Sequence, residues 1–242
     1  MQFDILKTNI TKVTADAIVL PANEHLKEGS GTSTAIFEAA GRTNLTQACK
    51  KIGHCDIGNA VPTPAFNLNA KFVIHAVAPC WVDGEHGEYN MLSSAYLTAL
   101  NLADAMGCES IAFPVLSSGN NGFDKELAIH IAKESFEHFS GSHLKHIMLI
   151  IYGDSMEELV KSLGYSISST PSYFQYDEQK FKHKKRIRKL FGEGKDIAQQ
   201  IILDQIEKGL EWLKDKENLE KVLQYACVVV KLAFDLKKST RK

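Results

Sequence analysis

The chain has 242 residues, of which 44% are apolar and 24% are charged, a balance typical of a soluble globular protein that buries a core. This composition excludes a chain that is disordered throughout. The net charge of −1 conceals an asymmetry: residues 1–170 hold 11 Lys and Arg against 18 Asp and Glu, whereas residues 171–242 hold 17 against 11. A basic rear can mark an acidic partner, or it can be a solvated face or a surface that docks on the acidic front.

The cysteines and the apolar runs predict the compartment. The cysteine count is odd and no pair has C-x-x-C spacing, which argues against a disulfide framework or a zinc site. The opening ten residues have no signal-peptide pattern, and the apolar stretch 222–234 is interrupted by Gln224 and Lys231 and is too short to span a bilayer. These features predict a cytoplasmic protein with free thiols and no membrane contact. The cysteines are Cys49, Cys55, Cys80, Cys108 and Cys227.

Strand and helix patterns alternate along the front of the chain. Apolar alternation or short apolar runs predict strands at residues 3–5, 17–20, 72–78, 111–116 and 146–151. Apolar residues at helical spacing predict helices from near residue 35 and over 45–52, 91–106, 124–139 and 155–163. Such alternation predicts an α/β fold with a largely parallel sheet covered by helices on both faces.

Two loops rich in small residues follow predicted strands, at residues 23–34 and 117–123. In a parallel α/β sheet, ligands bind beyond the carboxyl ends of strands, and glycine-rich loops let backbone amides approach a phosphate. The pair could therefore clamp a diphosphate, although ordinary turns would have the same composition. Neither loop has the Lys and Ser/Thr of a P-loop, and no G-x-G-x-x-G motif is present, so ATP hydrolysis and a Rossmann cofactor site are poorly supported. The Ser and Thr residues of the first loop are expected to cap the helix that follows.

Four sequence blocks resemble the macrodomain family, in the family's own order. Residues 10–41 (ITKVTADAIVLPANEHLKEGSGTSTAIFEAAG) resemble its first signature, and residues 59–81 (NAVPTPAFNLNAKFVIHAVAPCW) its second block. Residues 111–124 (IAFPVLSSGNNGFD) are similar to the phosphate-loop block, and residues 147–153 (IMLIIYG) to the last core strand. The resemblance covers residues 2 to about 160. It implies a three-layer α/β/α macrodomain with a mostly parallel mixed sheet that binds ADP-ribose without a metal or a cofactor.

The resemblance also implies a site, residue by residue. Asn9 and Ile10 stand where the family's Asp-Ile pair reads adenine, and an uncharged Asn9 is expected to select adenine more weakly. Asn23 matches the asparagine that contacts the distal ribose, which makes it the one catalytic candidate; a turn or cap residue is the alternative. Tyr152 stands where an aromatic stacks on adenine, unless it is a core residue at a strand end. The phosphate loops correspond to Gly29, Ser30, Gly31 and Thr32, and to Ser117, Ser118, Gly119, Asn120, Asn121, Gly122 and Phe123, the last flanking the distal ribose or simply packing.

The resemblance is compatible with an enzyme and with a non-catalytic reader. One hydrolytic branch of the family has an aspartate after the glycines, and Ser33 stands there in this chain. A second branch lacks that aspartate and uses the bound diphosphate to activate water, a route that Asn23 would permit. The resemblance implies binding of ADP-ribose or a mono-ADP-ribosylated protein, with slow hydrolysis of mono-ADP-ribosyl ester links; the alternative is a non-catalytic reader or metabolite sensor. His75, in mid-strand, is predicted to be a hydrogen-bonded core residue.

The rear of the chain has a different composition and no resemblance to the family. We expect a macrodomain over 1–165, a linker over 166–179 and a basic α-helical extension over 180–242, in which two amphipathic segments form a helical hairpin. The extension could pack on the first domain, associate with a second copy or a partner protein, or, least favoured, bind nucleic acid. The basic residues concerned are Lys182, Lys184, Lys185, Arg186, Arg188 and Lys189.

Overall fold

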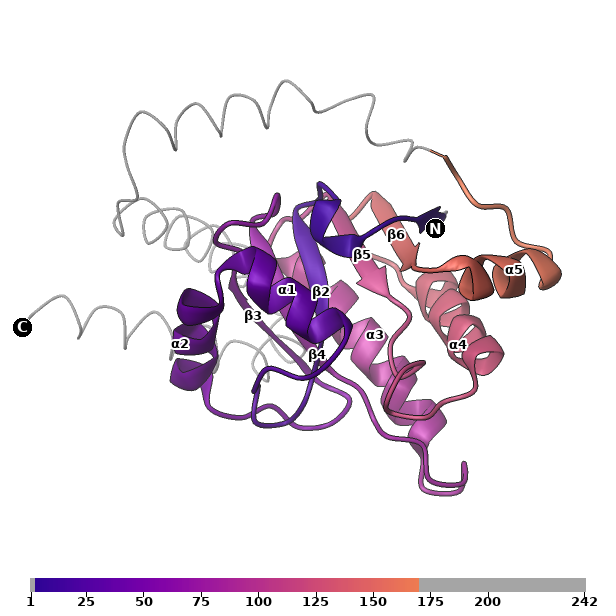
Figure 1. Ribbon diagram of the computed structural model, residues 1–242, viewed down its shortest axis with the longest axis horizontal. Coiled ribbons are helices and arrows are strands. Elements are labelled where there is room, and N and C mark those ends of the chain that lie inside the picture. Colours follow the sequence, from indigo (N-terminus) through magenta and orange to yellow (C-terminus); the bar gives the residue numbers. More distant parts are fainter. Residues whose placement is uncertain (1–2, 170–242) are drawn as a thin grey trace, which may run out of the picture.

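A computed structural model describes residues 3–169, which form one six-stranded sheet with helices on both faces (Figure 1). The strand order is β1-β6-β5-β2-β4-β3, and every neighbouring pair is parallel except β3 and β4. The sheet is therefore mixed but mostly parallel, as predicted. The strands are β1 (Phe3–Lys7), β2 (Ala17–Ala22), β3 (Ala60–Pro64), β4 (Phe72–Val77), β5 (Ser110–Pro114) and β6 (His146–Ile151).

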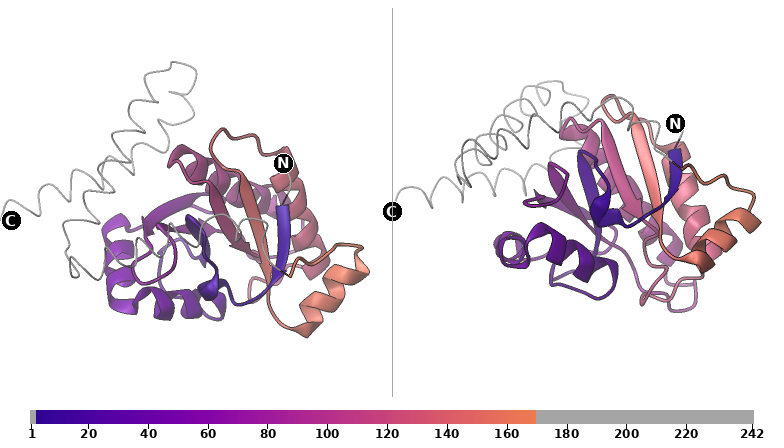
Figure 2. Two further views of the ribbon diagram at one scale, coloured as in Figure 1. Left: turned by 90° about the horizontal axis from the view of Figure 1, so that it is seen from above. Right: turned by 45° about the horizontal axis from the view of Figure 1, so that its top comes forward.

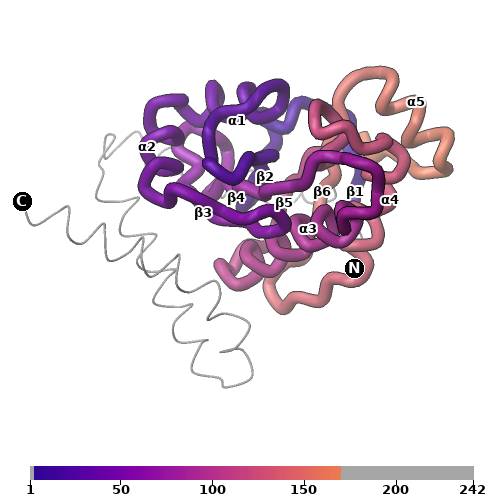
Figure 3. Tube along the Cα trace, turned by 90° about the horizontal axis from the view of Figure 1, so that it is seen from below, coloured from indigo at the N-terminus to yellow at the C-terminus, as the bar shows by residue number. Residues whose placement is uncertain are grey.

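The helices divide between the two faces, and the view from below shows the sheet between α1 and α2 on one side and α3 and α4 on the other (Figure 3). Figure 2 shows the same layers from two further directions. The three-layer expectation is confirmed. The helices are the 3-10 turn η1 (Ile10–Lys12) and α1 (Thr32–Ala40), α2 (Arg42–Ile52), α3 (Glu88–Ala105), α4 (Lys125–His138) and α5 (Asp154–Ser162).

Alternate residues of each strand feed two separate hydrophobic cores. In β2, Val19 packs toward α3 and α4 with Leu92, Tyr96 and Phe136, whereas Ile18 packs toward α1 and α2. The second core contains Ile36, Phe37 and Leu45. Burial on both faces explains why the central strands are continuous apolar runs.

Three details differ from the sequence-based prediction. The antiparallel edge strand β3 was not predicted, since its two prolines interrupt the pattern that a strand shows. Strand β2 continues through Pro21 to Ala22. Helix α1 begins at Thr32 and not near residue 35, and its N-cap is Gly31, without a side-chain cap from the Ser and Thr residues of the loop.

The segment after α5 returns to the sheet. The amide of Ser168 donates to the carbonyl oxygen of Ile5 over 2.8 Å, and Ile167 packs against the core shared with α3 and α4. The first residues of the expected linker therefore cover the outer edge of β1. The predicted helical hairpin lies outside the described residues. Within residues 3–169, no helix has the length and apolar character needed to cross a membrane.

Candidate functional site

The two small-residue loops lie side by side beyond the carboxyl ends of β2 and β5, which are neighbours in the sheet. The side-chain amide of Asn120 donates to Ser30 Oγ over 2.7 Å, so the loops are joined by a direct hydrogen bond. Helix α1 starts immediately after Gly31, and its N-terminus contributes amides and a positive dipole end beside this junction. The two loops that the sequence singled out therefore lie together at one edge of the sheet.

The conformation of the first loop is fixed by hydrogen bonds within the loop and by an ion pair with a residue of α2. Gly31 has φ +58° and ψ −120°, a conformation that a residue with a side chain rarely adopts. Ser33 is 4% exposed, and its Oγ accepts from the amide of Gly29 over 3.0 Å, while Thr34 Oγ1 donates to the Gly29 carbonyl oxygen. Arg42, at the start of α2, forms a bidentate pair with the Glu28 carboxylate at 2.7 and 2.9 Å. Ser33 thus stabilises the loop, and its hydroxyl is engaged inside it.

Asn23 lies at the start of the first loop and points both ends of its amide at one residue. Its Nδ2 donates to the Lys27 carbonyl oxygen over 2.8 Å, and its Oδ1 accepts from the Lys27 amide over 3.1 Å. This pair of bonds closes the turn around Leu26, which is buried at a positive φ of 53°. Asn23 therefore stabilises a turn, as the alternative interpretation of this residue predicted. It also lines the cavity described below.

The second loop is anchored to the segment that directly follows β4. Ser117 has φ +60°, and its Oγ donates to the Pro79 carbonyl oxygen over 2.8 Å. Asn121 Nδ2 donates to the carbonyl oxygens of Ala78 and Pro79, both at 3.1 Å. Phe123 is 3% exposed and contacts the Trp81 ring edge-on, with centroids 5.1 Å apart. Phe123 therefore packs, and Asn121 and Ser117 fix the loop against the end of β4. The remaining loop residues are Ser118, whose Oγ donates to Val115, and the exposed Gly119 and Gly122.

The residues expected to read adenine lie at the other end of the site. Asn9 caps η1, and its Oδ1 accepts from both the amide and the hydroxyl of Thr11, at 3.0 and 2.8 Å. Ile10 is 6% exposed and belongs to the core beneath. Tyr152, just after β6, is 78% exposed, so the alternative that it is a core residue is wrong. Its ring is accessible for stacking.

Glu88 is a buried carboxylate that the sequence reasoning missed. It is the first residue of α3, is 2% exposed, and both of its oxygens accept hydrogen bonds from the preceding loop. Burial alone raises the pKa of a carboxyl, but these backbone hydrogen bonds outweigh it and lower the pKa of Glu88 to about 2. The signal in the sequence is a glutamate directly after the glycine that starts a helix. The amide donors are Val82, Asp83 and Gly84 to Oε1, at 3.1, 3.2 and 3.1 Å, and His86 to Oε2, at 2.8 Å.

A cavity of about 340 Å³ opens between the β2 and β4 ends and the loop that Glu88 organises. Asn23 and Asn121 contribute to its wall, and so do Ile57, Val82 and Met91. Its size falls at the lower end of the range of small-molecule sites, roughly 300–1,000 Å³. Ile57, Val82 and Met91 do not belong to the site expected from the sequence.

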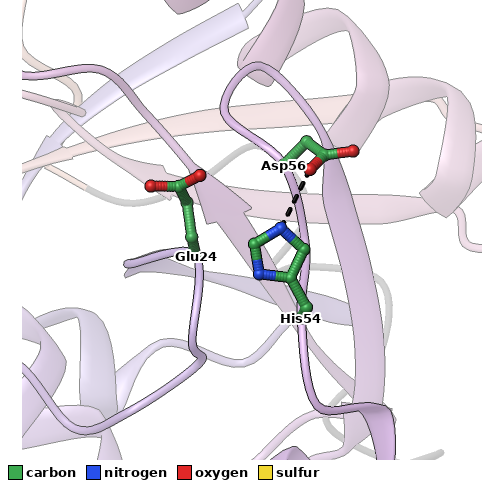
Figure 4. A group of neighbouring side chains, drawn as sticks. All are labelled: Glu24, His54 and Asp56. Atoms are coloured by element: carbon green, nitrogen blue, oxygen red, sulfur yellow. Dashed lines mark hydrogen bonds and ion pairs between the residues drawn. The ribbon is translucent and has the colours of Figure 1, made fainter.

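Two groups of side chains have donor atoms close enough to hold a cation. The donor atoms of Glu24, His54 and Asp56 lie within 4.8 Å of one another, and His54 Nε2 is 2.9 Å from Asp56 Oδ1 (Figure 4). All three side chains are exposed. The second group contains Asp83, His86 and Glu88. Because the oxygens of Glu88 already accept from four amides, the first group is the better cation ligand set.

His75 is the core residue that its position in the strand predicts. It is fully buried in mid-β4, and its Nε2 lies 2.9 Å from Thr63 Oγ1 on β3. Burial lowers the pKa of His75 to about 3, so the ring is neutral at physiological pH. It takes no part in the site.

Comparison with known proteins gives consistent matches to one family. Residues 19–132 match the family profile described as "Macro domain". The chain is 41% identical over 165 residues to an O-acetyl-ADP-ribose deacetylase of Escherichia fergusonii, covering 66% of this chain and 93% of that protein. An Oceanobacillus iheyensis macrodomain variant solved with ADPR superposes with a TM-score of 0.61 and 26% identity over 65% of this chain and 89% of the other. A Trypanosoma brucei macrodomain solved with ADP-ribose superposes with a TM-score of 0.59 and 26% identity, over 66% of this chain and 68% of the other.

Proposed function

The chain belongs to the macro domain family, and on that premise we propose that it binds ADP-ribose and hydrolyses acyl esters of its distal ribose. The observation that carries the proposal is the hydrogen bond between Asn120 and Ser30, which joins the two small-residue loops into one anion-binding edge. The E. fergusonii relative is named as a deacetylase of O-acetyl-ADP-ribose, a substrate of this ester class. A glutamate- or aspartate-linked mono-ADP-ribosyl protein is an ester of the same ribose.

In the proposed complex, the backbone amides of residues 30–32 and 118–121 donate to the diphosphate, and the start of α1 adds its positive dipole end. Asn23 positions the distal ribose, and Tyr152 stacks on adenine. A water oxygen then attacks the ester carbonyl carbon, and the bond from that carbon to the ribose oxygen breaks. The ribose oxygen takes up a proton, and the acyl group leaves as a carboxylic acid.

Hydrolysis is expected to be slow, because Ser33 stands where one hydrolytic branch of the family has its aspartate. The Ser33 hydroxyl accepts from Gly29 inside the loop, and a serine does not act as a base at neutral pH. The bound diphosphate is the group proposed to activate the water. Absence of a positioned general base typically costs about 10²- to 10⁴-fold in rate.

The second candidate is a reader that binds ADP-ribose without turnover. Two observations favour it: the buried, engaged hydroxyl of Ser33 and the double hydrogen bond that commits the Asn23 amide to Lys27. A reader would leave residues 180–242 as the effector part of the chain, acting through self-association or a partner protein. Those residues lie outside the described structure.

The test uses the full chain and two substrates, O-acetyl-ADP-ribose and a protein carrying glutamate- or aspartate-linked ADP-ribose. Wild type is compared overnight with Asn23→Ala and Gly119→Glu. Release of ADP-ribose by wild type alone supports the hydrolase. No release, with calorimetric ADP-ribose binding that Gly119→Glu abolishes, supports the reader. No calorimetric or thermal-shift response to millimolar ADP-ribose overturns both.

A further inference from the structure

Four of the five exposed large hydrophobic side chains of residues 3–169 lie at or beside one cavity. Five such side chains are exposed, and three of them, Ile57, Val82 and Met91, line the 340 Å³ cavity. A fourth, Tyr89, contacts the Trp81 ring beside it, with centroids 5.6 Å apart. Single exposed hydrophobics are ordinary on a protein surface, whereas a cluster around a hollow indicates a ligand.

This cavity continues directly from the proposed ribose position. Asn23 and Asn121 are part of its wall, and Asn121 is tied to the end of β4 through Ala78 and Pro79. A group attached to the distal ribose would therefore project into it. This step rests on the proposed function, because it takes Asn23 as the residue that positions the ribose.

The apolar wall is held in place without a ligand. Glu88 binds four amides of the loop that carries Val82, and this carboxylate is at the start of the helix that carries Met91. On the opposite wall, the Gly58 amide next to Ile57 donates to the Val77 carbonyl oxygen over 2.8 Å. A preformed apolar wall binds an aliphatic chain with little ordering cost.

The charges at the cavity are mainly negative. Glu24 and Glu88 contribute to the wall, with His86 as the single basic group there. Asp83 accepts from His86 Nδ1 over 2.9 Å and offsets that cation when the ring is protonated. An anionic group on the ligand would meet these carboxylates in a partly desolvated space, where like charges repel strongly.

We propose that this cavity is an acyl-binding site, which takes the uncharged aliphatic acyl group of an O-acyl-ADP-ribose ester and prefers chains longer than acetyl. A methyl group leaves most of the apolar wall uncovered, whereas each added methylene that contacts it strengthens binding about fourfold. An ADP-ribosylated polypeptide is the poorer fit. Its ester lies only a few bonds from peptide groups, and an aliphatic wall leaves their hydrogen-bonding atoms without partners.

The experiment measures kcat/KM of the full chain for acetyl, butyryl and succinyl esters of ADP-ribose. We expect butyryl to exceed acetyl by about 16-fold, from two added methylenes at about fourfold each. The succinyl ester, of the same chain length with a terminal carboxylate, should fall below butyryl by at least about tenfold. If the chain binds esters without turnover, the same ratios are read from dissociation constants.

Three variants assign the preference to the cavity. The double variant Val82→Thr with Met91→Gln keeps side-chain size but makes the wall polar, and the butyryl-to-acetyl ratio should fall toward one. Met91→Leu keeps the wall apolar and should keep the ratio. Asn101→Gln, on the exposed surface of the same helix and outside the cavity wall, is the matched control and should leave it unchanged.

Four other outcomes would overturn the acyl-binding site. ADP-ribose binding with equal use of acetyl and butyryl esters, or a butyryl preference that survives in the double variant, overturns the acyl site and leaves the proposed function intact. Faster turnover of an ADP-ribosylated protein than of any acyl ester, lowered by the double variant, assigns the wall to polypeptide and also overturns it. No binding of ADP-ribose overturns the proposed function, and the acyl site falls with it.

Discussion

The two ends of the proposed ADP-ribose site differ in preorganisation, which is the extent to which their side chains are already fixed without a ligand. At the distal-ribose end, Phe123 is 3% exposed against Trp81, and Asn121 is held by two carbonyl oxygens. At the adenine end, Tyr152 is 78% exposed. A preformed end loses little conformational freedom on binding, whereas an exposed side chain must be ordered by the ligand. We therefore expect the diphosphate and distal-ribose end to set the affinity and the adenine end to modulate it.

The largest expected effect lies in the second loop, between the two ends. A Cβ atom at Gly119 would meet no heavy atom within 4 Å, so substitution there is sterically tolerated. Gly119→Glu places a carboxylate beside the proposed diphosphate, and we expect calorimetric affinity for ADP-ribose to fall by at least about 100-fold. Gly119→Ala is the matched control and should stay within about fivefold. Equal binding by Gly119→Glu and wild type would mean that the diphosphate lies elsewhere.

The next effect is at the open end. Stacking of a base on an aromatic ring is worth about 1–3 kcal/mol, so Tyr152→Ala should weaken ADP-ribose binding by about tenfold. Because Tyr152 is remote from the proposed ester, kcat for hydrolysis should not change. Tyr152→Phe keeps the ring and should bind like wild type. A fall in kcat with unaltered affinity would contradict the assignment of Tyr152 to adenine.

Substitution of Asn9 at the adenine end is expected to increase the affinity for ADP-ribose. Its Oδ1 already accepts two hydrogen bonds from Thr11, and the other end of its amide is a donor, which opposes the adenine amine. Asn9→Asp keeps an oxygen for Thr11 and supplies a second, charged acceptor. We expect ADP-ribose to bind about threefold to tenfold more tightly, with less change for the inosine analogue, whose base lacks the amine. An equal gain for both ligands would assign the effect to η1 and not to adenine.

The contrast between the two ends also explains what the sequence could predict. Strands such as β6 (His146–Ile151) are continuous apolar runs buried on both faces, so their pattern alone gives their bounds. The two loops were predictable as a pair, because small residues follow strands whose carboxyl ends share one sheet edge. The placement of Tyr152 outside the core was not, since an aromatic residue after a strand has the same sequence pattern whether it is buried or exposed.

The features of the site that the sequence did not predict depend on contacts that leave no periodic pattern in the sequence. The side chains of Ser33 and Asn23 bind their own loop, and no sequence pattern indicates which atoms they contact. Glu88 is a glutamate in an acidic stretch, which usually remains solvated, and its burial follows from a loop that folds back over it. The cavity wall comes from separate segments, represented by Ile57, Val82 and Met91, that no local pattern connects.

Glu88 offers a test of the preformed end through pH. The pKa of Glu88 is lowered from 4.5 to about 2 in the folded chain, so its contribution to stability is complete above about pH 4.5 and is lost as pH falls toward 2. Glu88→Gln keeps the shape and removes this titration. In urea unfolding followed by circular dichroism, the stability difference between wild type and variant should shrink between about pH 5 and pH 2.5. A difference that is constant across this range would show that the charge of Glu88 does not hold the loop.

A second group, His75, also changes the stability of the fold in this acidic pH range. The pKa of His75 is lowered to about 3 from 6.5 by burial, so the stability that comes from keeping its ring neutral is complete above about pH 6.5 and is lost as pH falls toward 3. Wild type and Glu88→Gln share this loss, and it cancels in their difference. At neutral pH, Glu88→Gln should change ADP-ribose affinity by no more than about threefold, because the substituted glutamine retains a side-chain oxygen for the amides of the loop.

The smallest expected effect is that of a chelator. The proposed diphosphate contacts are backbone amides, so excess EDTA should leave ADP-ribose affinity and ester hydrolysis within about twofold of the untreated protein. The informative control is His54→Ala, since His54 is the one nitrogen donor of the exposed Glu24, His54 and Asp56 group beside the cavity. Hydrolysis that EDTA abolishes, that Zn²⁺ restores, and that His54→Ala also lacks would give the distal end a metal-bound water. It would then supply the water activation for which Ser33 offers no base, and the contrast between the two ends would be chemical as well as structural.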